Sequence, residues 1–234
     1  MAPIYITLPN KDRSVLSTQH GTGNYNVKLS ETLSFPGEWE AFLVSADIPY
    51  TWYNVTDKNN NIVLPGKTIH LTPGNYSSAS MLIENINKLL TNVTISVDQN
   101  SMRVTVKVNK DYISGDILQL LGFPIGTKLG VGIHTSPHLV DITSGVNSIL
   151  VYLSIIQNTN VGSFQVPLLK TIPISDAQPG DIIHWEAKGP DYEAHKLNTR
   201  SFQNIEVDIR DTLGNSIDFN NYTIQLLVGI RKSK

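Results

Sequence analysis

Two histidines have a spacing that could bind a metal. His134 and His138 are four residues apart, which on a helix would bring both rings to one face. The intervening Thr-Ser-Pro includes a proline, which excludes a helix here. No acidic residue follows until Asp141, so a third ligand is missing. We therefore expect solvated loop histidines and no metal site.

A second group of titratable residues lies near residue 190. Asp191, Glu193 and His195 alternate, with His184 and Glu186 close by in sequence. On one strand face they would form an acid–base pair or a mononuclear metal site. The group follows Gly189-Pro190, a turn signal, which favours a polar surface loop.

Two carboxylates, Asp208 and Asp211, have the residue types of a glycosidase pair. Asp208 alternates with the apolar residues Val207 and Ile209, which predicts a solvent-facing role. No Gly-x-Ser-x-Gly nucleophile elbow or phosphate-binding glycine loop with Gly-Lys-Ser/Thr is present. The sequence thus predicts no catalytic residue, no cofactor and no metal.

The elements that carry these residues are mainly β-strands with period-two alternation. Turn signals such as Pro65-Gly66 and Pro73-Gly74 separate them. The expected strands are 26–29, 42–48 (with Phe42, Val44, Ala46 and Ile48 on one buried face), 62–71, 94–97, 103–108, 148–156, 164–174, 181–186, 205–210 and 224–230. We predict an all-β fold, an antiparallel β-sandwich, of which the eight-stranded jelly roll is the commonest form.

One helical interruption is expected. Helices are predicted at about 76–91, with Ser77 or Ser78 as N-cap, and at 114–121, with two strands between them. We expect a single jelly-roll domain over 1–234, with an inserted α/β elaboration at about 73–146 that includes a long loop over 126–144.

The composition excludes several classes of protein. The 234 residues include no cysteine, which excludes disulfide scaffolds and thiol nucleophiles. The net charge of −2 gives no sign of a nucleic-acid partner. No signal peptide and no apolar stretch of membrane-spanning length is found, so we expect a soluble protein made in a reducing compartment.

The segment 148–156 is apolar on both faces. Ile149, Val151, Leu153 and Ile155 fill one face; Leu150, Tyr152 and Ile156 make the other nearly as apolar. In a two-sheet sandwich only one face meets the core, so the other must be covered. The alternatives are the protein's own insert and a neighbouring subunit. Our hypothesis is a subunit interface at Leu150, Tyr152 and Ile156, because tyrosine is enriched at interfaces.

Several segments, in order, resemble the minor capsid (penton) proteins of Polinton/Maverick elements and adintovirus-like double-stranded DNA viruses. They cover roughly residues 37–232. They are Trp39–Val55, Pro73–Asn87 closing in Leu120–Phe123, Ser148–Gln157, Val166–Ile174, Phe202–Asp211 and Ile217–Phe219.

The resemblance implies a structural protein of the virion and no enzyme. It implies a single jelly roll that forms homopentamers at icosahedral capsid vertices, beside a double-jelly-roll major capsid protein, with synthesis in the host cytoplasm. The alternative is a carbohydrate-binding β-sandwich module or glycan hydrolase, in which Trp39, Trp52 and Trp185 would stack on sugars. Such a protein should show a carboxylate and an aromatic side chain converging on one groove.

Overall fold

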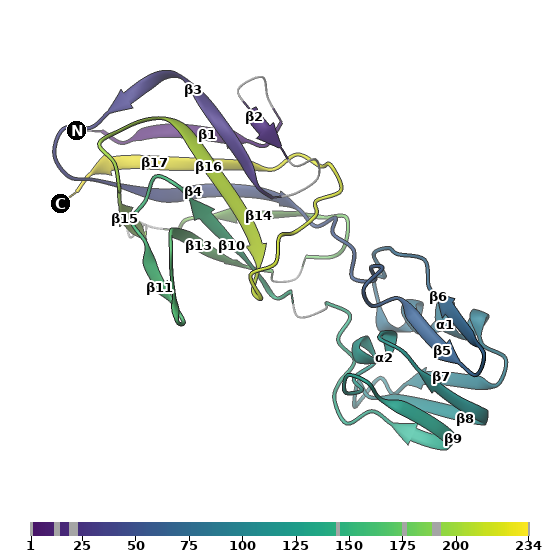
Figure 1. The fold of residues 1–234 in the computed structure, drawn as a ribbon. Helices are drawn as coiled ribbons and strands as arrows, with labels where there is room; N and C mark the ends of the chain where they lie inside the picture. The colour runs from purple at the N-terminus through teal and green to yellow at the C-terminus, as the bar shows by residue number, and fades with distance from the viewer. Residues whose placement is uncertain are drawn as a thin grey trace. The chain divides into compact units, whose positions relative to one another are not determined.

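The computed structural model describes residues 2–11, 15–18, 23–143, 146–174, 177–188 and 193–233. The chain divides into two compact units, which Figure 1 draws. The first unit combines Met1–Thr51 with Val146–Lys234, and the second is Trp52–Gly145. Each unit has its own sheets and its own apolar interior.

Two antiparallel sheets make up the first unit. One sheet has the order β1 (Ile4–Pro9), β17 (Gln225–Lys232), β4 (Trp39–Pro49), β14 (Ile182–Glu186), and β15 (Ala194–Lys196) also pairs with β4. The other has the order β13 (Leu168–Pro173), β10 (Ser148–Leu153), β16 (Ser201–Asp211), β3 (Tyr25–Ser34), β2 (Val15–Thr18). A separate two-stranded ribbon joins β11 (Thr159–Val161) to β12 (Phe164–Val166).

Eight of these strands have jelly-roll connectivity. Counted along the chain as β1, β3, β4, β10, β13, β14, β16 and β17, they give the order 1-8-3-6 in one sheet and 2-7-4-5 in the other. Successive strands alternate between the two antiparallel sheets except for the fourth and fifth, β10 and β13, which are neighbours in one sheet, and this arrangement of two Greek keys defines a jelly roll. The predicted antiparallel sandwich is therefore confirmed.

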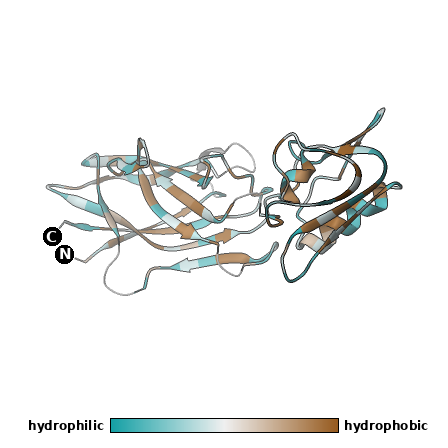
Figure 2. Ribbon diagram, turned by 90° about the horizontal axis from the view of Figure 1, so that it is seen from below, coloured by the Kyte–Doolittle hydropathy of each residue, from teal (hydrophilic) through white to brown (hydrophobic). Residues whose placement is uncertain are grey.

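Alternation along the strands builds the core between these sheets. Ile205, Val207 and Ile209 of β16 are buried, whereas Glu206 and Arg210 are exposed, as the sequence pattern predicts. Figure 2 shows hydrophobic and hydrophilic residues interleaved along the strands. Full burial of one such aliphatic side chain is worth about 1.5–3 kcal/mol, so these strands anchor the sandwich.

A bulge changes the faces of β4. The register of β17 on β4 shifts by one residue at Val44, which has no partner on β17. Val44 is therefore only half-buried and does not continue the buried face of Ala46 and Ile48, contrary to the sequence-based expectation. Beyond the bulge the Phe42 ring lies over Gly229, where an added Cβ would come within 2.3 Å of the ring.

The second unit packs one sheet against helices. Its sheet has the order β6 (Lys67–His70), β5 (Asn61–Leu64), β8 (Val104–Ser114), β7 (Val93–Val97), and β9 (Lys128–Thr135) also pairs with β8. The helices are α1 (Ala79–Leu89) and α2 (Ile117–Leu120), so both expected helices are confirmed with shorter bounds. Ser78 caps α1, since its hydroxyl accepts a hydrogen bond from Met81 N–H at 3.1 Å.

The sequence predicts an insertion over about 73–146, whereas the second unit starts at Trp52 and includes β5 and β6.

Three elements differ from the strands and loop expected from the sequence. The strand expected over 62–71 is a hairpin, because Pro65-Gly66 forms the turn between β5 and β6. The strand expected over 164–174 is divided at Pro167, which has no N–H for a sheet ladder. The loop expected over 126–144 contains β9, whose glycines at 130 and 132 hid the strand pattern.

Candidate interaction surface

The two histidines with metal-like spacing do not converge. His134 lies on β9, and its Nε2 donates a hydrogen bond to the carbonyl oxygen of Gly130 at 2.8 Å. His138 lies in the following loop, where its main-chain N–H donates to Gly122 O at 3.1 Å. In the part of the chain that the structure describes, no three His, Cys, Asp or Glu residues gather as a metal site.

Of the group around residue 190, Glu193 and His195 line one common cavity of about 400 Å³, whereas His184 lies on β14. Glu193 accepts a hydrogen bond from Lys170 at 2.6 Å, and this contact holds the pKa of the Glu193 carboxyl below its usual value. His195 lies on β15, with Nε2 3.1 Å from Leu169 O. Asp191 lies outside the described residues.

His184 lies on β14, on the outer face of the same sheet that contains β15. Its Nδ1 lies 2.6 Å from Asp47 Oδ1 across β14 and β4, where the two residues are register partners. The hydrogen bond with Asp47 raises the pKa of the His184 imidazole. Both side chains are exposed, so the contact is a surface ion pair that forms when the ring is protonated.

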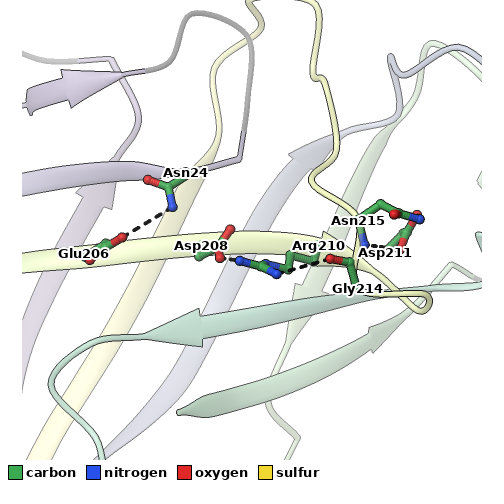
Figure 3. A network of polar contacts seen from close by, with 7 residues as sticks. All are labelled: Asn24, Glu206, Asp208, Arg210, Asp211, Gly214 and Asn215. Atoms are coloured by element: carbon green, nitrogen blue, oxygen red, sulfur yellow. Dashed lines mark hydrogen bonds and ion pairs between the residues drawn. The ribbon is translucent and has the colours of Figure 1, made fainter. Parts of the chain in front are cut away.

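The two carboxylates of glycosidase type have separate structural roles (Figure 3). Asp208 accepts a hydrogen bond from Arg210 Nε at 2.7 Å, and Arg210 Nη1 donates to Gly214 O at 3.2 Å. Asp211 is buried and accepts from the main-chain N–H of Asn215 at 2.8 Å and from its side-chain amide at 3.0 Å. Because residues 208 and 211 are three apart on one strand, their side chains point to opposite faces and do not flank a common substrate site.

Two of the three tryptophans are buried. Trp39 and Trp52 are each 6% exposed, and Trp39 Nε1 donates to Pro36 O at 3.1 Å. Trp185 is half-buried on β14, with the Lys170 ammonium 5.7 Å from its ring centre. Neither buried ring presents the open face that sugar stacking requires.

The outer face of β10 presents apolar side chains beside the charged residues of β16. Ile149, Val151 and Leu153 point into the core, so Leu150 and Tyr152 lie on the opposite face and are half-buried. This alternation is the one expected from the sequence.

Tyr152 lies in a groove of about 240 Å³. Its register partners are Leu168 on β13 and Asp208 on β16, and the Arg210 guanidinium lies 6.0 Å from its ring centre. Partial burial raises the pKa of the Tyr152 phenol, and Arg210 acts against this shift. The groove is lined by Tyr152, Leu153, Ser154, Val166, Pro167, Glu206, Asp208 and Arg210. An apolar floor with a polar, ion-paired rim is the usual anatomy of a protein–protein interface.

Ile156 departs from the expectation for this face. β10 ends at Leu153, a turn follows, and Ile156 forms an isolated bridge with Leu197. Ile156 is 0% exposed, so its side chain belongs to the core and not to the surface that carries Leu150 and Tyr152. The break in strand geometry after Leu153 is the reason, because alternation applies only within a continuous strand.

The ribbon of β11 and β12 adds a feature that the sequence did not indicate. Phe164 is 72% exposed beside the turn at Gly162, and Val166 at the base of the ribbon lines the Tyr152 groove with Pro167. A two-stranded ribbon with an exposed aromatic side chain is marginally stable in water alone. In the sequence, the Gly162-Ser163 pair before Phe164 is the turn signal that could have indicated this ribbon.

Among the described residues, none of the helices has the length and apolar character to cross a membrane. The class that the architecture defines is a jelly-roll β-sandwich with a second unit inserted between β4 and β10. No protein-family model matches the chain, and no curated protein sequence matches it.

Two solved structures are similar to this chain over nearly its whole length. The crystal structure of the mavirus penton protein is similar with a TM-score of 0.56 and 9% identity, over 99% of this chain and 100% of that one. A chain of the Sputnik virophage structure is similar with a TM-score of 0.51 and 12% identity, over 98% of each chain. At such identities the likeness shows a shared fold.

Proposed function

We propose that this chain is a structural capsid protein of a virus or virus-like element, the penton subunit at the vertices of the particle. The observation that carries the proposal is the end-to-end match of the fold, over 99% of the chain, to a virophage penton protein. The resemblance of the ordered segments to Polinton/Maverick and adintovirus minor capsid proteins supports the same role. In this proposal the chain is not an enzyme, and its partners are itself and a double-jelly-roll major capsid protein of the virion.

A vertex on a five-fold axis requires a closed ring of five copies. In a cyclic ring each subunit uses two different surfaces, one toward each neighbour. We propose that the outer face of β10, with Leu150 and Tyr152, is one of these surfaces, and that Phe164 on the neighbouring ribbon belongs to the same contact. Ile156 has no part in it, because its side chain is in the core.

A charge at Tyr152 tests the proposal. Tyr152→Asp removes the apolar ring from the groove and places there a carboxylate, beside Glu206, Asp208 and Arg210, that a partner subunit would strip of its water. Loss of one buried anchor costs about 2 kcal/mol or more at an interface, which is enough to dissociate a modest ring. We expect wild-type protein to elute as a pentamer in size-exclusion chromatography with light scattering, and the variant to elute as a folded monomer.

Tyr222→Asp is the matched control. Tyr222 is an exposed tyrosine of the same unit, in the turn before β17, and its substitution should leave the pentamer intact. The assignment of the β10 face to a partner is wrong if Tyr152→Asp still forms pentamers, or if Tyr222→Asp dissociates them equally. Circular dichroism of both variants separates loss of assembly from loss of fold.

A further inference from the structure

A polar cavity of about 400 Å³ lies at the rim of the jelly roll, where β13 is the outermost strand of its sheet. Its walls come from three elements of the first unit: β11 of the ribbon, the first four residues of β13, and β15 with the preceding Glu193. Figure 1 shows β11, β13 and β15 beside one another. Of the lining residues that the structure describes, none is shared with the Tyr152 groove. The volume is within the range of about 300–1,000 Å³ that is usual for small-molecule sites.

An ion pair forms the polar centre of this cavity. Lys170 Nζ lies 2.6 Å from Glu193 Oε2, and the Lys170 side chain is only 25% exposed. The Trp185 ring, whose centre is 5.7 Å from the same ammonium, also helps to hold it. The hydrogen bond with Lys170 holds the pKa of the Glu193 carboxyl below its usual value, so both members are charged at neutral pH. An ammonium has three donors and a carboxylate two acceptor oxygens, so the pair retains capacity for a ligand.

Two further side chains add hydrogen-bonding groups, and an aliphatic wall completes the cavity. His195 Nε2 donates to Leu169 O at 3.1 Å, so in the neutral ring the other nitrogen, Nδ1, is an acceptor. Asn160 of β11 is exposed, and its amide supplies both a donor and an acceptor. Val161 and Leu168 are half-buried and form the aliphatic wall.

The fixed charges that line the cavity cancel. Lys170 and Glu193 contribute one charge of each sign, and no other Lys, Arg, Asp or Glu is among its described lining residues. The next charged side chain of β15, Lys196, is paired with Glu38 at 2.9 Å. A ligand with a net charge would therefore lose its hydration without meeting a net opposite charge. A neutral ligand with adjacent hydroxyl groups fits better, because one hydroxyl donates to the carboxylate and its neighbour accepts from the ammonium.

We propose that this cavity binds a neutral pyranose sugar, which combines adjacent hydroxyls with apolar C–H groups on one ring. The Lys170–Glu193 pair bridges two adjacent hydroxyls. Asn160 and His195 bind further hydroxyls, and the aliphatic wall packs against the C–H groups. A free sugar and the terminal residue of a glycan chain present the same chemistry. The inference does not depend on the proposed capsid role.

Saturation-transfer NMR with the full chain tests the inference. The probes are the methyl pyranosides of glucose, galactose, mannose and N-acetylglucosamine, and at least one should bind with a dissociation constant of about 1 mM or below. Its uronic acid and its 2-amino analogue should each bind at least about threefold more weakly, because a charged group loses its hydration in a cavity without net charge. A trisaccharide that ends in the same sugar distinguishes the sources: tighter binding assigns the site to a glycan chain, and equal binding assigns it to a free sugar.

Two variants localise the binding. Glu193→Gln removes the charge of a side chain that is 59% exposed, so the fold is retained, and it should weaken sugar binding at least about tenfold. Glu38→Gln is the matched control, because Glu38 accepts from Lys196 in the same kind of ion pair outside the cavity; it should bind as wild type does.

Three results would each overturn the inference. They are absence of binding by all four methyl pyranosides, tighter binding of a charged analogue, and equal effects of Glu193→Gln and Glu38→Gln on sugar binding.

Discussion

The contact between Phe42 and Gly229 gives a quantitative test of the sandwich. A Cβ added at Gly229 would lie 2.3 and 2.5 Å from two atoms of the Phe42 ring, closer than carbon atoms approach. We expect Gly229→Ala to destabilise the fold by about 1–3 kcal/mol, because a packed interior yields only at the cost of strain. Phe42→Ala alone should cost about 3–5 kcal/mol, since it removes a buried ring.

The double variant separates this contact from a general effect. Once the ring is absent, the methyl group of Gly229→Ala has space. The double variant should therefore be destabilised by at least about 1 kcal/mol less than the sum of the two single variants. Midpoints of urea unfolding at one fixed protein concentration measure all three variants. Gly130→Ala is the control, because an added Cβ there meets no atom within 4 Å. A neutral Gly229→Ala, or strict additivity in the double variant, would refute the reasoning.

Two further predictions concern single polar contacts. Asp47→Asn should lower the pKa of His184 toward its ordinary value, which NMR titration of the ring measures. Because the pKa of His184 is raised in the folded state, the ion pair contributes its full stability at a pH below the pKa of this histidine in the unfolded chain. The contribution is lost as the pH rises through the pKa of His184 in the folded protein. An unchanged pKa in the variant would contradict the assigned cause. Asn87→Ala leaves Ile95 N–H and C=O without their partner, so it should cost about 1–3 kcal/mol in thermal unfolding and speed exchange of the Ile95 amide. Unchanged exchange there would show that the Asn87 side chain does not protect the Ile95 amide.

Sequence alternation predicted the core strands well where a strand is continuous. Ile205, Val207 and Ile209 are buried as predicted, and so are the alternating residues Leu226, Val228 and Ile230 of β17. The same rule did not hold at Val44 and Ile156, because a bulge and a strand end change the alternation without a proline or glycine to mark them. Such features depend on pairing with a distant strand, which one sequence does not display.

The candidate surface was predictable in part. The sequence indicated Tyr152 because a strand that is apolar on both faces must be covered by other residues on both sides. Tyr152 lies on the outer face as expected. The Arg210 side chain over its ring and the groove wall at Pro167 follow from the order of strands in the sheet, which alternation alone does not specify. β9 was missed because glycine at 130 and 132 removes the apolar residues that mark a strand.

The mass of the purified chain under native conditions tests the central claim most directly. The capsid account predicts an assembly of five copies of the 25.9 kDa chain, since a vertex protein of this kind closes a five-membered ring. A single copy at every concentration, or a two-fold dimer, would contradict it.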